Sequence, residues 1–451
     1  MNRDAIDFNS ADIGRLFRQM FFPTLAGMLS IAVITVTDGI FVGQGVGGDA
    51  LAAINIFCPL WMVMTGISLM FGAGGSVVIA VHLSQGKQKA ADINMTQSLA
   101  VATLLALTFI GVMRLFGSEV AAMLGCSERL LPYYFDYAGY LVPSFLFYIW
   151  GGIGLFLIRL DGSPRYAMAC NMASAAVNVV LDYLFIFPMG MGIKGAAIAT
   201  ALSGVTSGVM AMSYILLSMH SMKLYGLKPS MKSLRLTLRN IGYQCRIGSS
   251  ALLGELAMAF MMFIGNIVFM KYLGEEGVAA FSIACYCLPM VFMVGNAVAQ
   301  SAQPIISYHY GAGNFSNVGR ALRISLLTAC LSGAAVTAAI GIWHSEVVGM
   351  FIDRSDGAFA IADNGLPTIA VGFLFFITNL TFIGYYQSIK QVGRATLYTF
   401  ARGFLFVFAF FMLLPELCGT TGIWLAMPAA EAATLLLILA THPKTNAVFE
   451  K

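Results

Sequence analysis

Residues 24–43 read TLAGMLSIAVITVTDGIFVG. A helix of about 20 apolar residues crosses the hydrocarbon core of a bilayer. This stretch contains one charged side chain, Asp38. Since an ionised carboxylate at the bilayer centre costs about 2.5 to 3.5 kcal/mol, the stretch predicts a membrane-spanning helix whose carboxylate faces protein or a water-filled path.

Comparable apolar runs continue to the end of the chain. Of its 451 residues, 59% are hydrophobic and 10% are charged, whereas soluble domains are about 25% charged. The runs lack the period-two alternation of barrel strands, which leaves helices as their regular structure. We predict an all-α polytopic membrane protein with twelve transmembrane helices, at about 17–43, 51–82, 96–116, 131–158, 166–187, 193–219, 245–270, 277–307, 321–343, 363–388, 395–414 and 420–441.

The distribution of Lys and Arg predicts the orientation. If the N-terminus is cytoplasmic, 19 of the 25 basic residues fall on the cytoplasmic side, five fall opposite and Arg402 lies within a helix. We therefore expect both termini in the cytoplasm. The first apolar run is too long for a cleavable signal. Because this topology explains the net charge of +4, we expect no nucleic-acid partner.

No catalytic set of residues is recognisable. We find no Ser-His-Asp spacing, no phosphate loop and no metal-ligand cluster, so we expect neither enzyme activity nor a cofactor. Eight cysteines lie almost entirely within the predicted helices, where they act as small hydrophobes. Cys285 and Cys287 form a C-x-C pair, but no second pair completes a metal site.

The chain contains two similar halves. The basic stretch 220–246 separates six predicted helices from six, and a shift of 227 residues aligns Gly47 with Gly274 and Gly86 with Gly313. Because each half has an even number of spans, the repeats are parallel, with a pseudo-two-fold axis along the membrane normal, and such repeats build carriers that rock around a central site. The predicted domains are an N-lobe, a cytoplasmic inter-lobe linker and a C-lobe, at 1–219, 220–244 and 245–451.

Four polar residues are expected to form a cation site in the N-lobe. Asp38 lies toward the outer end of the first helix. Asn178 and Asp182 share one face of the fifth helix, and Thr200 begins the polar part of the sixth. If these helices pack together, desolvation and mutual repulsion of the carboxylates favour binding of H⁺, and the oxygen ligands also suit Na⁺. Alternatively, Asn178 and Asp182 only join helices by hydrogen bonds, or Asp38 is solvated.

Pro23 is the expected hinge of the first helix. It lies 15 residues before Asp38, and its missing N–H and its ring weaken the helical hydrogen-bond ladder. Coupling would follow if protonation of an N-lobe carboxylate favoured one shape of this helix. A static kink is the alternative.

Glu255, in the seventh helix, is the expected charge of a site for organic cations. No nearby basic residue on that helix neutralises it. Thioethers and aromatic faces suit hydrophobic cations of varied shape, although Met and aromatic side chains are also common packing residues. The expected substrate-binding residues are Glu255, Tyr140, Met258, Met262, Met290 and Met293. We also predict a structural ion pair between Glu431 in the last helix and Arg402 in the eleventh.

The order and spacing of several motifs give the chain a family likeness. It resembles the multidrug and toxic compound extrusion (MATE) transporters over nearly all twelve helices. The motifs are Pro23 with Asp38, Gly43 and Ala52-Ala53; Asn178-x-x-x-Asp182 with Gly195-Ala196-Ala197-x-Ala199-Thr200; Gln303-Pro304-Ile305-Ile306-Ser307-Tyr308 with Gly311-Ala312; and Gly422-Ile423-Trp424-x-Ala426-x-Pro428-x-x-Glu431.

The resemblance implies two six-helix lobes that open alternately to either side of the bacterial inner membrane and export amphipathic organic cations in exchange for H⁺ or Na⁺. It places the cation site at Asp38, Asn178, Asp182 and Thr200. Some members pair acids in the seventh and tenth helices, but here the tenth offers Asn379 and no mid-membrane acid, so Glu255 is assigned to the central cavity. The pattern looks closer to the DNA-damage-inducible and staphylococcal-type branch. We expect a monomer whose partners are small organic cations and membrane lipids.

Three other classes are open at this stage. A lipid-linked oligosaccharide flippase of the same superfamily would need a basic central cavity, whereas only Arg402 lies deep in a helix. An ion channel would conduct ions without exchange. A membrane-embedded enzyme would show a nucleophile or a metal constellation.

Overall fold

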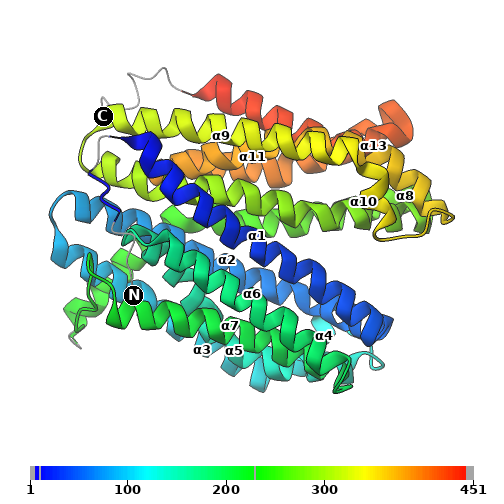
Figure 1. The fold of residues 1–451 in the computed structure, drawn as a ribbon, viewed down its shortest axis with the longest axis horizontal. Helices are drawn as coiled ribbons and strands as arrows, with labels where there is room; N and C mark the ends of the chain where they lie inside the picture. The colour runs from blue at the N-terminus through cyan, green and yellow to red at the C-terminus, as the bar shows by residue number, and fades with distance from the viewer. Residues whose placement is uncertain (1–5, 10–11, 228–229, 443–451) are drawn as a thin grey trace. The chain divides into compact units, whose positions relative to one another are not determined.

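The computed structural model describes residues 6–9, 12–227 and 230–442, and every regular element in these ranges is a helix (Figure 1). The predicted all-α class is therefore confirmed. Four basic residues behind the predicted orientation lie outside these ranges, namely Arg3, Lys228, Lys444 and Lys451. The elements are α1 (Ile13–Gly45), α2 (Gly48–Ser84), α3 (Gln88–Leu115), α4 (Gly117–Met123), α5 (Leu131–Leu160), α6 (Pro164–Ile186), α7 (Gly192–Leu217), α8 (Met231–Gly311), α9 (Phe315–Ile342), α10 (His344–Gly349), α11 (Gly357–Ser388), α12 (Val392–Phe400), the π-helical segment η1 (Ala401–Leu405) and α13 (Phe406–Thr441).

Ten helical runs in the described ranges are long and apolar enough to cross a membrane. Two of them contain a break at a glycine with positive φ, α8 at Gly274 (φ 65°) and the run from α12 through α13 at Gly419 (φ 59°). Because a helix cannot continue through such a residue, the ten runs contain the twelve predicted spans. The short helices α4 and α10 have seven and six residues, too few for a hydrophobic period to show in the sequence.

The turns between helices repeat along the chain. Gly86 and Gly313, aligned from the sequence, both have positive φ, 69° and 73°. A further pair appears at an offset of 228, where Gly162 has φ 81° and Lys390 has φ 59°. Lys390 is the single non-glycine residue with positive φ in the described chain. The second repeat therefore has the same left-handed turn, but with lysine at the position where the first repeat has glycine.

Replacing Lys390 by glycine is expected to stabilise the protein by about 1 kcal/mol. A left-handed conformation costs an L-residue about 1 to 2 kcal/mol, partly offset by the greater backbone entropy of glycine when unfolded. The reciprocal change, Gly162→Lys, should destabilise more, since its Cβ would lie 2.7 Å from the carbonyl oxygen of Ile6. Thermal unfolding of the two purified variants in detergent tests this. A lower melting temperature for Lys390→Gly would contradict the assignment of strain.

Contacts divide the chain into two units. The first unit contains Phe22–Leu252, and the second contains Leu253 onward together with the first turns of α1, up to Phe21. The contacts thus group the predicted linker and the first turns of α8 with the first unit.

Small residues let the helices of the first unit approach closely. A side chain at Gly208 on α7 would clash with the backbone of Phe147 on α5, and packing of this type is common between membrane helices. The core of the unit includes the fully buried rings of Phe57, Tyr134 and Phe145. The ring centroid of Phe57 on α2 lies 5.9 Å from that of Tyr134 and 6.1 Å from that of Phe145, both on α5.

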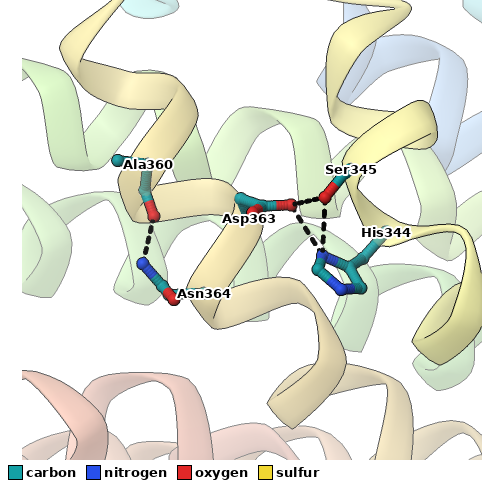
Figure 2. A network of polar contacts seen from close by, with 5 residues as sticks. All are labelled: His344, Ser345, Ala360, Asp363 and Asn364. Atoms are coloured by element: carbon teal, nitrogen blue, oxygen red, sulfur yellow. Dashed lines mark hydrogen bonds and ion pairs between the residues drawn. The ribbon is translucent and has the colours of Figure 1, made fainter. Parts of the chain in front are cut away.

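The second unit uses the same device. A Cβ at Gly333 on α9 would lie 2.8 Å from Cα of Leu374 on α11. At one end of the unit, α10 is tied to α11 by a polar contact (Figure 2). His344 Nδ1 lies 2.6 Å from Oδ1 of Asp363, and the Ser345 hydroxyl donates to the same oxygen at 2.6 Å.

Candidate functional site

The candidate site lies in the first unit, where α1 runs along α6 (Figure 1). A Cβ at Gly27 on α1 would lie 3.1 Å from Nδ2 of Asn171, and one at Gly45 would clash with Ile186. Two glycines on one helix thus allow close contact with α6 near both of its ends. This packing brings the C-terminal part of α1, with Asp38, alongside the part of α6 that carries Asp182.

The four residues predicted for the cation site gather here. Asn178 and Asp182 lie one turn apart on α6, and both are fully buried. The Asn178 amide donates to the hydroxyl of Thr200 on α7 at 3.4 Å. Asp38 is half-buried and interacts electrostatically with Asp182. The structure therefore brings two carboxylates, an amide and a hydroxyl together, while their role stays a prediction.

Several oxygens of this cluster have no hydrogen-bond donor within the described chain. They are Oδ1 and Oδ2 of Asp182, Oδ1 of Asp38 and Oδ1 of Asn178. Ionised carboxylates are acceptors only, so neither aspartate can satisfy the other. A buried polar group without a partner costs free energy. A proton on one carboxylate, or a small cation between the oxygens, would give these acceptor oxygens a partner. Oxygen ligands are those that hard cations prefer.

Tyr137 and Cys58 also lie near the carboxylates and are not among the residues predicted from the sequence. Tyr137 on α5 is buried and interacts electrostatically with both Asp38 and Asp182. Its ring lies edge-on to Phe57 at 5.5 Å. Cys58 on α2 interacts electrostatically with Asp38. Nothing in the spacing of 17 tyrosines marks one of them as facing α1 and α6, because that depends on how α5 is rotated.

The positions of the second unit that match Asn178 and Asp182 carry no carboxylates. At the offset of 228 that relates Gly162 to Lys390, the counterparts of Asn178 and Asp182 are Phe406 and Phe410. Benzyl side chains cannot coordinate H⁺ or Na⁺. The acid pair therefore belongs to the first repeat.

The second unit carries a different polar cluster, made by Asn379, Arg402 and Glu431. Arg402 Nε donates to Oε1 of Glu431 at 2.7 Å, and Asn379 Nδ2 donates to Oε2 at 2.8 Å. All three side chains are buried, and the guanidinium lies 3.9 Å from the ring centroid of Phe376. The predicted ion pair is confirmed. Arg402 lies in η1, and π-helical segments occur mostly as single turns, frequently at functional sites.

The expected substrate-binding residues lie in both units. Glu255 on α8 is half-buried and forms no ion pair with a residue of the described chain. Met258 is buried, at 9% exposure. Met290 and, in the first unit, Tyr140 are half-exposed, at 53% and 47%. Met262 and Met293 are half-buried. Contact of these residues with a substrate stays a prediction.

Together, the duplicated set of apolar helices and the buried carboxylates define a multi-pass membrane transporter. A sequence model of the MatE family matches residues 23–184 and 251–412, one match in each half. The chain therefore belongs to the MatE family. It is not an enzyme, since the relatives are named as transporters and exporters.

Relatives of known name agree with this family. The chain is 27% identical over 328 residues to the FAD transporter of Shewanella oneidensis, covering 70% of each chain. It is 23% identical over 449 residues to the multidrug export protein MepA of Staphylococcus aureus, covering 96% of this chain and 95% of that one. The predicted likeness to the staphylococcal-type branch is thus confirmed.

The fold also agrees with solved structures. The outward-facing conformation of a multidrug resistance MATE family transporter of the MOP superfamily matches with a TM-score of 0.90 over 98% of both chains, at 22% identity.

Proposed function

We propose that this transporter exports small organic cations across the bacterial inner membrane in exchange for H⁺ or Na⁺. The observation that carries the proposal is the pair Asp38 and Asp182, whose buried oxygens lack donors. Carboxylates at membrane depth are costly unless they serve a pathway or an ion. The relationship to the multidrug export protein MepA supports a drug-like cargo.

The coupling ion acts on the packing of α1 against α6. With H⁺ or Na⁺ bound, the two aspartates are held together by a shared positive charge. When the ion leaves, two like charges at short distance repel each other, and α1 moves away from α6 at this level. Pro23 lies inside α1 and lowers the cost of bending there. Ion release therefore biases the shape of α1.

Glu255 provides the charge that selects the cargo. Two acids lie in the interior of predicted spans of the second unit, Glu255 and Glu431. Glu431 is neutralised by Arg402, whereas Glu255 forms no ion pair with a described residue. A half-buried carboxylate near flexible methionines favours a hydrophobic cation. The protein works as a monomer, with both termini in the cytoplasm.

A second candidate cargo is a flavin nucleotide, because one relative is named as an FAD transporter. A pyrophosphate in a membrane cavity requires Arg or Lys side chains with free N–H groups. Arg402 is hydrogen-bonded to Glu431 and lies over the ring of Phe376. Its positive charge is therefore already paired with a carboxylate and does not remain for a phosphate. The same argument disfavours a lipid-linked oligosaccharide. A cationic cargo fits the acids of the spans better.

Reconstituted vesicles test the proposed function. Purified protein is placed in vesicles with an imposed proton gradient or sodium gradient, and the movement of ethidium is followed by fluorescence. One of the two gradients is expected to drive ethidium against its own gradient, and protein-free vesicles should show no such movement. Gradient-driven movement of FAD and not of ethidium would contradict the cationic cargo. Ion flux that is independent of any substrate would indicate a channel.

A further inference from the structure

The first four turns of α8 form an amphipathic segment, Met231–Arg246, whose inner face is fixed to α3. Gln97 on α3 donates to the Thr237 hydroxyl at 2.8 Å and accepts from the Asn240 amide at 3.0 Å. Gln244 donates to the side chain of Asn94 at 3.0 Å. Thr237, Asn240 and Gln244 recur at helical spacing, so one side of this segment packs against α3 of the first unit.

The opposite face of the segment carries a stripe of four cations. These are Lys232, Arg235, Arg239 and Arg246, which follow each other at i, i+3, i+7 and i+14. At 100° per residue all four point away from Thr237. All are exposed, and the segment contains no Asp or Glu. None of them forms an ion pair with a described residue.

Apolar side chains flank the cationic stripe on both sides. Leu234 and Leu238 lie on one side, with 54% and 66% of their surface exposed. Leu236 and Tyr243 lie on the other, and both are also exposed. A helix face that is merely solvated would interleave acids with the bases and would not expose leucines. Lys and Arg side chains together with exposed leucines on one helix are typical of amphipathic helices that lie in a membrane interface.

The depth of the segment fits a membrane interface. On α3, Asp92 is followed by an uncharged run, 93–113, that is long enough to cross the hydrocarbon core. Asn94 and Gln97 therefore lie where this run meets the headgroups. Since both bond to α8, Thr237 and its neighbours are held at the same level.

We propose that the stripe of Lys232, Arg235, Arg239 and Arg246 is a binding surface for the headgroups of anionic phospholipids. The guanidinium and ammonium groups contact the phosphates, while Leu234, Leu236 and Leu238 enter the acyl boundary. The bound lipid thus holds the first turns of α8 against the membrane.

Native mass spectrometry of the purified full-length protein tests this proposal. The protein in detergent is titrated with phosphatidylglycerol and, separately, with phosphatidylcholine. Wild-type protein should retain phosphatidylglycerol preferentially. Each cation replaced by glutamine should weaken that binding about fivefold, because a basic residue near an anionic surface contributes about 1 kcal/mol. The variant with all four replaced should bind both lipids alike, and Arg235→Lys with Arg239→Lys should bind as wild type does.

A matched control separates the stripe from total charge. The control variant replaces Arg15, Arg18, Arg320 and Arg323 by glutamine, four exposed basic residues on α1 and α9. It loses the same charge and should keep the preference for phosphatidylglycerol. The proposal is overturned if the stripe variant keeps its preference, or if the control loses as much as the stripe variant does. Elution as a single monodisperse peak shows that each variant is folded.

Discussion

Replacing Asp182 by asparagine is expected to abolish ion-driven efflux while leaving the protein folded in the membrane. The amide has nearly the shape of the carboxylate, so the fully buried position on α6 gains no cavity. It carries no negative charge, however, and it cannot release a proton. The site then keeps only the charge of Asp38, and exchange with the coupling ion is lost. Resistance of cells to ethidium, measured at matched expression, checks this result.

Asp136→Asn is a suitable control for that experiment. Asp136 is an aspartate of the same unit whose ion pair with Lys194, at 3.4 Å, is exposed to 40% and 50%. Exposed pairs contribute about 0 to 1 kcal/mol, so efflux should be unchanged. If Asp182→Asn transported as well as Asp136→Asn does, the assignment of the ion site to α6 would be wrong.

Replacing Arg402 by alanine is expected to destabilise the protein by about 3 to 5 kcal/mol. The change leaves the Glu431 carboxylate buried without its cation, and an uncompensated buried charge costs about that much. It also removes the guanidinium that lies over Phe376. The melting temperature of the purified protein and its yield in membranes should both fall.

The double variant Arg402→Met with Glu431→Met should recover most of that loss. Apolar residues of similar volume often replace a buried ion pair at little cost. Arg129→Ala serves as the exposed control, since its pair with Asp49 is 75% and 42% exposed. A melting temperature for Arg402→Ala equal to that of Arg129→Ala would show that the Arg402–Glu431 pair does not stabilise the second unit.

The sequence was sufficient for features that depend on local composition. The spans follow from runs of apolar residues, because the bilayer requires them at fixed length. The breaks at Gly274 and Gly419 fall between predicted spans, since only glycine adopts positive φ easily. The pairing of Arg402 with Glu431 was also accessible, because few buried charges compete for partners in a chain with 10% charged residues.

Features that depend on the rotation and contact of helices were not accessible. Tyr137 faces the two aspartates only because α5 presents that side to α1 and α6. The helical start of α8 at Met231 lies within the predicted linker 220–244, where basic residues mask its amphipathic period. Lys390 has the conformation of a glycine, and residue type alone gives no sign of it.

Titration of the purified protein tests whether Asp38 and Asp182 bind the coupling ion. Proton uptake and binding of radioactive Na⁺ are measured on the wild type and on the double variant Asp38→Asn with Asp182→Asn. The wild type is expected to bind H⁺ or Na⁺ that the double variant does not bind. Identical proton uptake and identical Na⁺ binding by the two proteins would contradict it.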